Sequence, residues 1–194
     1  MIALGVGKED YIITTPFTFI ATAGVISFLG SKPLFIDIDE RTFNIDTRKL
    51  EKFLEKTDEK VKGIIAVDLF GQTANYDEIH RITEKYRLFV LEDGAQPLGA
   101  EYRGKGACSL EDISTTSFFP PKPLCCFGDG GMVFTNNDKI AEKIKLIRNH
   151  GQSERYKHEV IGLNLRLDNL QAAVLLGKFG AFVNQEIDNR IRGC

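Results

Sequence analysis

Short apolar runs alternate with segments of helical periodicity along almost the whole chain. The runs are rich in Ile, Val and Phe, which is typical of buried strands. In the segments between them, apolar residues recur every three or four positions, so that each segment has one apolar face. The predicted strands cover 11–15, 33–38, 63–70, 88–91, 113–119 and 132–135, and the predicted helices cover 19–29, 49–56, 79–86, 140–147 and a longer segment from about 168 onward.

This order of elements predicts an α/β domain with a mostly parallel sheet. Strands that are apolar on both faces must be covered on both faces, and a helix between two strands makes them parallel. We find no internal repeat, low-complexity segment or linker, so we expect one domain over residues 1–194 with helices on both faces of the sheet. Ligands of such sheets bind at the carboxyl ends of the strands, and polar residues directly after a strand are therefore the first candidates for a site.

Composition narrows the class of protein. The chain is 43% hydrophobic and 27% charged, which is ordinary for a soluble globular domain. Its net charge of −2 without a basic run argues against a nucleic-acid partner, and no apolar run approaches the roughly 20 residues that span a membrane. The four cysteines, at 108, 125, 126 and 194, lack the spacing of metal ligands. They indicate reduced thiols in a cytoplasmic protein, with Cys125 and Cys126 as packing residues.

Lys122 lies in an unusual setting for a lysine, the segment SFFPPKPLCCFGDGG (117–131). Prolines at 120, 121 and 123 restrict the backbone on both sides of it. A nucleophilic lysine needs an apolar and rigid setting, because burial lowers the pKa of the amine and exposes its neutral form. The ordinary alternative is a solvated surface lysine. This segment alone leaves both interpretations open.

Asp93 ends an apolar predicted strand, FVLED, that leads into a turn of small residues. A carboxylate at this point could hold a cationic ring nitrogen, and Gln96 is close enough in the chain to assist. The alternative is that Asp93 caps the next helix, which is common for an aspartate after a strand.

Hydroxyl groups and glycines flank the lysine. Residues 114–117 (STTS) could bind a phosphate together with free backbone N–H groups, although strands of Ser and Thr are also common. Residues 128–131 (GDGG) lack both the Walker spacing and the GxGxxG spacing. We therefore interpret the glycines as allowing a tight turn beside Lys122.

A reactive lysine, a strand-end carboxylate, a phosphate site and an aromatic face are the groups that pyridoxal phosphate (PLP) needs. Several motifs of this chain, in their order and spacing, resemble the DegT/StrS family of sugar aminotransferases. The resemblance implies the large PLP-binding domain of fold-type I aminotransferases. The matching segments are TPFTFIAT (15–22), PLFIDID (33–39), EDGAQ (92–96), TSFFPPK (116–122), GDGG (128–131), RNHGQ (148–152) and GLNLRLD (162–168).

The resemblance implies a role for each of five residues in holding the cofactor. Lys122 would form the Schiff base with PLP and then move protons, while Asp93 would keep the pyridinium nitrogen protonated. Gln96 would contact the ring or its 3-oxygen. Phe19 would stack on the ring, and Ser117 would bind the phosphate.

Two further residues are implied to act across a subunit interface. Asn164 would reach the phosphate of the cofactor in a neighbouring subunit, which implies a homodimer with shared active sites. Arg166 would face the substrate across the same interface. The segments around Lys122 and at 150–156 (HGQSERY) look most like those of enzymes that aminate a nucleotide-linked 3-oxo sugar. The implied substrate is a UDP-linked 3-oxo-uronic acid for surface polysaccharide, with glutamate as the amino donor.

The chain departs from the family pattern at both ends. Met1 corresponds to the end of a helix that lies well inside other members, so we expect the upstream Ser-Gly-Thr phosphate segment to be missing. The small C-terminal domain is also expected to be missing. Cys125 stands where members usually carry Gly. Gly177 and Gly180 each weaken the last predicted helix by about 1 kcal/mol relative to Ala.

Four hypotheses for function follow. The first is a PLP-dependent sugar aminotransferase. The second is a catalytically inactive remnant of one, which acts only by associating with a full-length relative. The third, a sugar dehydratase of the same fold, is disfavoured because those relatives carry histidine in place of the lysine at 122. The fourth, a nucleotide-binding module built on the glycines, is disfavoured by their spacing.

Overall fold

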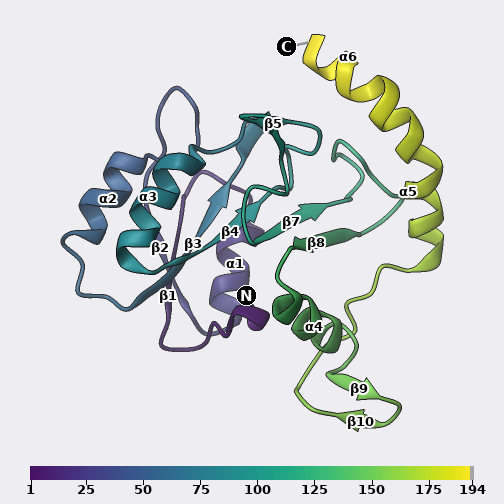
Figure 1. The fold of residues 1–194 in the computed structure, drawn as a ribbon, viewed down its shortest axis with the longest axis horizontal. Helices are drawn as coiled ribbons and strands as arrows, with labels where there is room; N and C mark the ends of the chain where they lie inside the picture. The colour runs from purple at the N-terminus through teal and green to yellow at the C-terminus, as the bar shows by residue number, and fades with distance from the viewer. Residues whose placement is uncertain (193–194) are drawn as a thin grey trace.

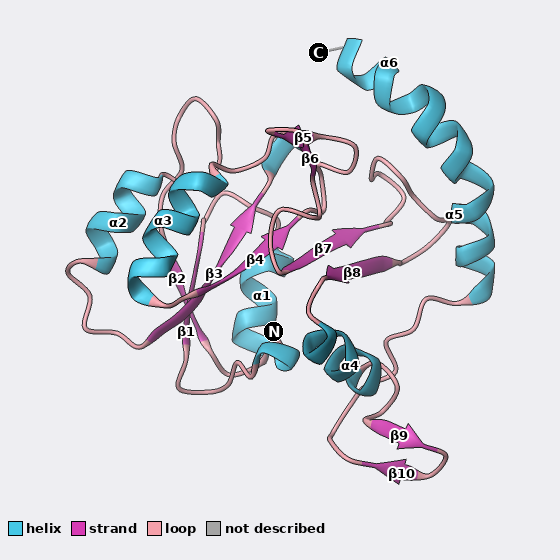
Figure 2. Cartoon of the chain, in the orientation of Figure 1, coloured by secondary structure: helices cyan, strands magenta, loops and turns pink. Residues whose placement is uncertain are grey.

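A six-stranded sheet forms the centre of the part of the chain described by the computed structural model, residues 1–192 (Figures 1 and 2). The strand order is β2-β1-β3-β4-β7-β8. Adjacent strands from β2 to β7 are parallel, and β8 is antiparallel to β7. The predicted α/β fold with a mostly parallel sheet is thus confirmed. The strands are β1 (Tyr11–Thr14), β2 (Lys32–Phe35), β3 (Val61–Val67), β4 (Phe89–Asp93), β7 (Ile113–Ser117) and β8 (Gly131–Thr135).

Helices cover both faces of the sheet, as its apolar strands require. Helices α2 (Thr47–Leu54) and α3 (Tyr76–Tyr86) pack on one face, and α1 (Ile20–Phe28) and α4 (Asp138–Ile147) pack on the other. Alternation along β4 separates the two cores, because successive side chains of a strand point to opposite faces. Val90 belongs to the core that contains Ile79 of α3, whereas Leu91 belongs to the core that contains Ile26 of α1.

Several short elements lie outside the predicted pattern. Two of them are hairpins whose paired strands are only two or three residues long and polar, so their sequences carry no apolar alternation. The short elements are η1 (Ile2–Leu4), η2 (Leu69–Gly71), β5 (Glu101–Tyr102) with β6 (Lys105–Gly106), and β9 (Gln152–Glu154) with β10 (Lys157–His158).

The predicted long C-terminal helix is present as α5 (Asn169–Ala181), a π-helical turn over Phe182–Glu186, and α6 (Ile187–Arg192). Asp168 caps α5 by accepting a hydrogen bond of 2.8 Å from the backbone N–H of Gln171. The π-helical turn begins two residues after Gly180, one of the two glycines expected to weaken this helix. Cys194 lies outside the described residues.

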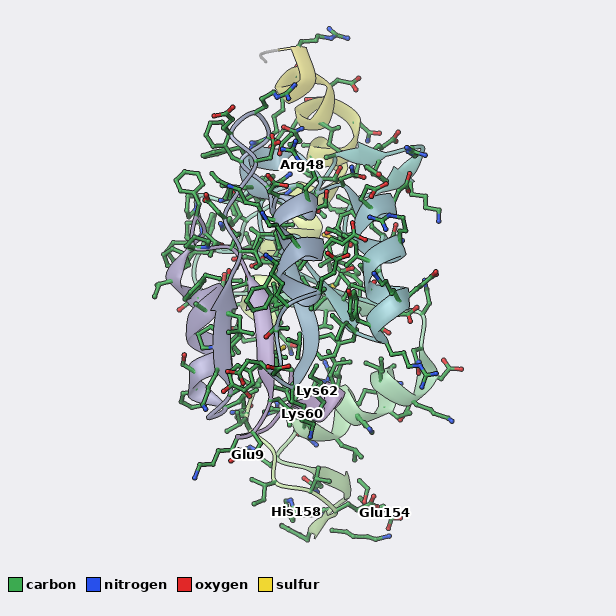
Figure 3. All side chains as sticks on the ribbon, turned by 90° about the vertical axis from the view of Figure 1, so that its left-hand side faces the viewer. Glu9, Arg48, Lys60, Lys62, Glu154 and His158 are labelled. Atoms are coloured by element: carbon green, nitrogen blue, oxygen red, sulfur yellow. The ribbon has the colours of Figure 1, made fainter. Side chains whose placement is uncertain are left out.

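The carboxyl ends of the parallel strands meet at one edge of the sheet. Asp68 directly follows β3, Asp93 ends β4 and Ser117 ends β7. Figure 3 shows Arg48, at the start of α2, near one end of the molecule, and Lys60 and Lys62, at the start of β3, towards the other. The edge that carries the three polar residues is the one at which the sequence predicted a site.

No helix within residues 1–192 is both long enough and apolar enough to cross a membrane.

Two carboxyl groups lie fully buried beneath this edge. Glu92 accepts hydrogen bonds from Leu110 N (3.1 Å), from Ser114 Oγ (2.6 Å) and from the backbone N–H of Cys108. One oxygen of Asp68 accepts hydrogen bonds from Ala74 N at 2.8 Å and from the Tyr76 hydroxyl at 2.9 Å. No donor among residues 1–192 reaches its other oxygen, Oδ2. Burial, reinforced by the nearby carboxylate of Glu92, raises the pKa of Asp68 to about 8.

We expect the stability of the fold to decrease as the pH rises towards 8. Asp68 releases its proton near pH 3.8 in the unfolded chain, but only near pH 8 in the folded chain. The raised pKa therefore stabilises the fold fully below pH 3.8, and this stabilisation is lost progressively as the pH rises from 3.8 to about 8. Urea unfolding should show a free energy that falls by up to about 1.4 kcal/mol per pH unit within this window. Asp68→Asn should reduce the slope, because its amide does not titrate, and a part should remain because burial also raises the pKa of Glu111 to about 8. The exposed Asp58→Asn is the control, and an unchanged slope in Asp68→Asn would contradict this assignment.

Candidate active site

The carboxylate of Asp93 is held in place at the end of β4. Its Oδ2 accepts a hydrogen bond of 2.8 Å from the hydroxyl of Thr22, which lies in the first turn of α1. The hydroxyl of Thr18 lies 3.0 Å from that of Thr22. The other oxygen of Asp93 accepts a bond of 3.3 Å from the backbone N–H of Ala95. These bonds orient a half-buried carboxylate at the strand end.

Asp93 does not cap a following helix, which was the alternative interpretation of its position. The next regular element after β4 is the short strand β5, and the residues between them form bends and turns. The donor to Asp93 Oδ2 comes instead from α1, which precedes Asp93 by about 70 residues in the chain.

Ser117 is brought close to Asp93 by the pairing of β4 with β7. Asp93 is in register with Thr115, so Ser117 lies two residues further along the adjacent strand. The hydroxyl of Ser117 accepts a hydrogen bond of 3.2 Å from the backbone N–H of Phe119. It thus lies at the same edge of the sheet as Asp93, immediately before the loop that carries Lys122.

Lys122 lies in a loop between β7 and β8 that is anchored at several points. Its backbone N–H donates to Phe119 O at 2.8 Å, which closes a turn over the two prolines. Phe118 N donates to Gly130 O at 2.8 Å and closes the base of the loop. Leu124 and Cys126 are buried in an apolar cluster with residues of α5. Lys122 is half-buried, which is an intermediate setting between a solvated lysine and a desolvated one.

The loop is also tied to α5, which runs beside it (Figure 1). Gln171 accepts a hydrogen bond of 2.8 Å from Phe127 N, and the ammonium group of Lys178 donates to Cys125 O at 2.8 Å. Cys126 packs in the cluster as predicted, while Cys125 lies against Lys178 with its sulfur 2.8 Å from Nζ. Two independent elements, the sheet and α5, therefore position the lysine loop.

The glycines after Lys122 are required for close packing. A β-carbon at Gly130 would lie 2.9 Å from the sulfur of Cys126, and one at Gly131 would lie 2.8 Å from Thr116 O. Both separations are shorter than side chains tolerate. These glycines let the two ends of the loop come together, so their role is close backbone approach.

Phe19 and Gln96 lie in the loops of the same edge. Phe19 occupies the N-cap position of α1, three residues before Thr22, and the residue is 75% exposed. A ring with this much free surface is available to stack on a planar ligand. Gln96 is half-buried in the turn after β4, three residues beyond Asp93. The structure thus places Phe19, Asp93, Gln96, Ser117 and Lys122 on strand ends or on the segments that directly follow them.

Asn164 and Arg166 lie elsewhere, on the exposed segment that connects β10 to α5. Asn164 pairs with Asn149 in an isolated bridge, and its side chain accepts a hydrogen bond of 3.3 Å from Arg166 Nε. Their contacts are with each other and with the end of α4. Both residues are thus exposed and lie outside the strand-end group.

Thr22 contacts the candidate site through Asp93 and was not singled out from the sequence. A signal was present, because Thr18 and Thr22 are four residues apart at the start of a predicted helix that follows a strand. Thr18 directly precedes the N-cap of α1, and its hydroxyl lies beside that of Thr22 in the first turn. The link of Thr22 to Asp93, 71 positions away, depends on the packing of α1 against the sheet.

Comparisons with solved structures define the class of the fold. An aminotransferase of the DegT DnrJ EryC1 StrS type from Brucella abortus superimposes with a TM-score of 0.89 at 36% identity, over 93% of this chain and 50% of that one. NtdA from Bacillus subtilis, solved with bound cofactor PMP, gives 0.82 at 33% identity, over 90% and 39%. The chain has the fold of fold-type I aminotransferases.

The sequence profile of the DegT/DnrJ/EryC1/StrS aminotransferase family matches residues 1–192, and the chain belongs to this family. A UDP-2-acetamido-2-deoxy-3-oxo-D-glucuronate aminotransferase of Pseudomonas aeruginosa is 50% identical over 93% of this chain and 49% of that protein. A GDP-perosamine synthase of Caulobacter vibrioides is 39% identical over 92% and 47%. The chain thus spans about half the length of the curated relatives it matches.

We expect Thr22→Val to destabilise the chain. Valine has nearly the shape of threonine but leaves Asp93 Oδ2 without its hydroxyl donor, and a hydrogen bond to a charged group contributes about 1.5–3 kcal/mol. Urea unfolding at neutral pH should show a loss of that size. Thr22→Ser, which keeps the hydroxyl, is the matched control and should lose much less. Equal losses in both variants would show that packing, and not the bond to Asp93, determines the effect.

Proposed function

We propose that residues 1–194 are the large, PLP-binding domain of a nucleotide-sugar aminotransferase. The proposal rests on the carboxylate of Asp93, which a hydrogen bond from Thr22 holds in place. Ser117 lies at the end of the adjacent strand, and Lys122 lies in the anchored loop that follows. An acid for a ring nitrogen, a hydroxyl for a phosphate and an amine on a rigid loop are three separate requirements of this cofactor. The presence of an acid, a hydroxyl and an amine at one edge of the sheet supports the proposal.

The residues present fit PLP in their chemistry. Asp93 accepts hydrogen bonds from the hydroxyl of Thr22 and from Ala95 N, and its carboxyl group, oriented in this way, would hold a proton on a pyridinium nitrogen. The exposed ring of Phe19 offers a stacking surface, and Ser117 offers a hydroxyl to the phosphate. NtdA, which has the same fold, was solved with bound cofactor PMP. When bound, PLP would supply an electron sink for the substrate carbon that exchanges its amino group.

Within this site, each residue would have a distinct task. Lys122 Nζ would attach the cofactor covalently at rest, and would accept and return a proton during each half-reaction. Asp93 would hold the proton of the ring nitrogen throughout. Gln96 would contact the ring or its 3-oxygen. The prolines around Lys122 would limit the motion of its backbone, so that Nζ returns to the same place after each proton transfer.

The substrate that we propose is a UDP-linked 3-oxo-uronic acid, with glutamate as the amino donor. The 50% identity with the Pseudomonas aeruginosa aminotransferase supports this choice over the other nucleotide sugars named among the relatives. The reaction would take place in the cytoplasm, and its product would be an amino sugar for surface polysaccharide. A folded chain that takes up no PLP would instead favour the inactive remnant.

Replacing Lys122 tests the proposal. We expect purified chain that is incubated with PLP and then reduced with borohydride to carry the cofactor on the peptide that contains Lys122. Lys122→Ala should abolish this adduct and slow the half-reaction with glutamate by at least about a hundredfold, because the proton carrier is lost. Mass spectrometry and stopped-flow absorbance measure the two effects. Lys145→Ala, on the exposed face of α4, is the control; an adduct that persists in Lys122→Ala would exclude the proposed role.

We also propose a homodimer in which Asn164 and Arg166 reach the partner's site. Lys122→Ala and Asn164→Ala chains should each be inactive alone, but a mixed dimer would contain one site with both residues intact. Mixing the two should restore up to about a quarter of the wild-type half-reaction rate, since half of the dimers are mixed and each has one intact site. Activity that stays absent after mixing, in dimers verified by sedimentation, would contradict shared sites.

A further inference from the structure

Three exposed phenylalanine rings gather at the carboxyl edge of the sheet, beside the residues assigned to PLP. We call Phe17, Phe43 and Phe70 the aromatic rim. The centroids of Phe17 and Phe43 are 5.9 Å apart, those of Phe43 and Phe70 are 5.7 Å apart, and those of Phe17 and Phe70 are 6.2 Å apart. The rings nevertheless remain 45%, 40% and 70% exposed, respectively. They contact one another while keeping much of their surface free.

Two of the three rings are held on an unfavourable backbone. Phe43 has a φ of 59° and Phe70 has a φ of 55°, in the left-handed region that side chains with a β-carbon rarely adopt. Glycine or asparagine would occupy both positions with less strain. Such conformations concentrate at ligand sites, where the position of a side chain matters more than local stability.

The side chain of Asn44 links the two strained loops. This residue is buried next to Phe43, and its amide donates to Gln72 O at 3.0 Å. The carbonyl oxygen of the same amide accepts a bond of 3.0 Å from Leu69 N. The two bonds hold the backbone at Leu69 and at Gln72, on either side of Phe70. Asn44 thus sets the position of one ring relative to the other.

The aromatic rim lies at the point where the strand order of the sheet reverses, between β1 and β3. From β1 the chain leads to β2 on one side, and β3 then pairs with β1 on the other side. Phe17 follows β1 and Phe70 follows β3, so both flank the crevice in which α/β sheets bind ligands. The rim also adjoins the site. Phe17 is two residues from Phe19, and a β-carbon at Gly71 would lie 3.9 Å from Gln96 O.

We propose that the aromatic rim binds the planar base of the nucleotide that carries the sugar. This inference rests on the proposed function for the identity of its ligand. An aromatic ring stacks on any base, because every base has a π face. Two relatives are named for a UDP-linked and a GDP-linked sugar product or substrate, which contain a pyrimidine and a purine. A stacking surface at this edge serves both kinds of base without a hydrogen-bonding pocket specific for one.

The test uses UDP and GDP as probes with the full chain. Isothermal titration gives the affinity, and saturation-transfer NMR shows which ligand protons contact the protein. We expect the base protons to be saturated more strongly than the ribose protons. Phe43→Leu and Phe70→Leu, which keep an apolar side chain but lose the ring, should each weaken both nucleotides by at least about fivefold. Phe28→Leu is the matched control, because Phe28 is 84% exposed at the far end of α1.

Phe70→Gly separates binding from folding. Glycine relieves the left-handed backbone, so this variant should stay folded and yet bind UDP more weakly. Three results would overturn the proposal: no binding of UDP by wild-type chain, equal affinity in the rim variants and in Phe28→Leu, or base protons less saturated than ribose protons. A dimer that dissociates in Phe70→Leu with unchanged UDP affinity would assign the rim to a subunit interface instead.

Failure of this inference can be told from failure of the proposed function. If Lys122 takes up PLP but UDP does not bind, the aromatic rim has no role in nucleotide recognition. If UDP binds at the rim but no PLP adduct forms on Lys122, the rim inference stands and the aminotransferase proposal fails.

Discussion

The parallel pairing of β3, β4 and β7 is the constraint on which the rest of the structure depends. Parallel strands end at the same edge, and the register sets which residues emerge there. Val67 is opposite Asp93, and Asp93 is opposite Thr115, so Asp68, Asp93 and Ser117 lie close together although they are far apart in the chain. A shift of one residue in β4 would send Asp93 to the face covered by α2 and α3 and would separate it from Thr22.

This register is held by the buried acid that precedes Asp93. Glu92 points to the opposite face and accepts hydrogen bonds from the loop at Cys108 and Leu110 and from Ser114 of β7. A buried carboxyl group without these donors would be strongly unfavourable, so the burial of Glu92 and the pairing of β4 with β7 depend on each other. The two adjacent acids thus lie in different settings. Glu92 is buried and bonded within the sheet, and Asp93 is half-buried at the candidate site.

Local strain appears where this edge meets solvent. Phe43 and Phe70 adopt backbone angles that glycine would adopt more easily, and Asn44 holds them together. The loop of Lys122 is restricted in another way, through prolines, close glycine contacts and ties to α5. The sheet thus supplies a rigid edge, and the loops that follow its strands present side chains in conformations that an isolated segment would not keep.

The sequence by itself determined the class of fold and proposed the residues of a candidate site. Apolar runs and helical periods are local signals, so the strands, α1 to α4 and the start of α5 could be predicted. The segments of Lys122 and Asp93 alone left their roles open, and the resemblance to the DegT/StrS family singled these two residues out. Short polar hairpins carry no such signal and were missed. The bond from Thr22 to Asp93 and the contact between Phe43 and Phe70 join residues from separate elements. Only tertiary structure decided them, because strand order and register set distances between residues that no local pattern encodes.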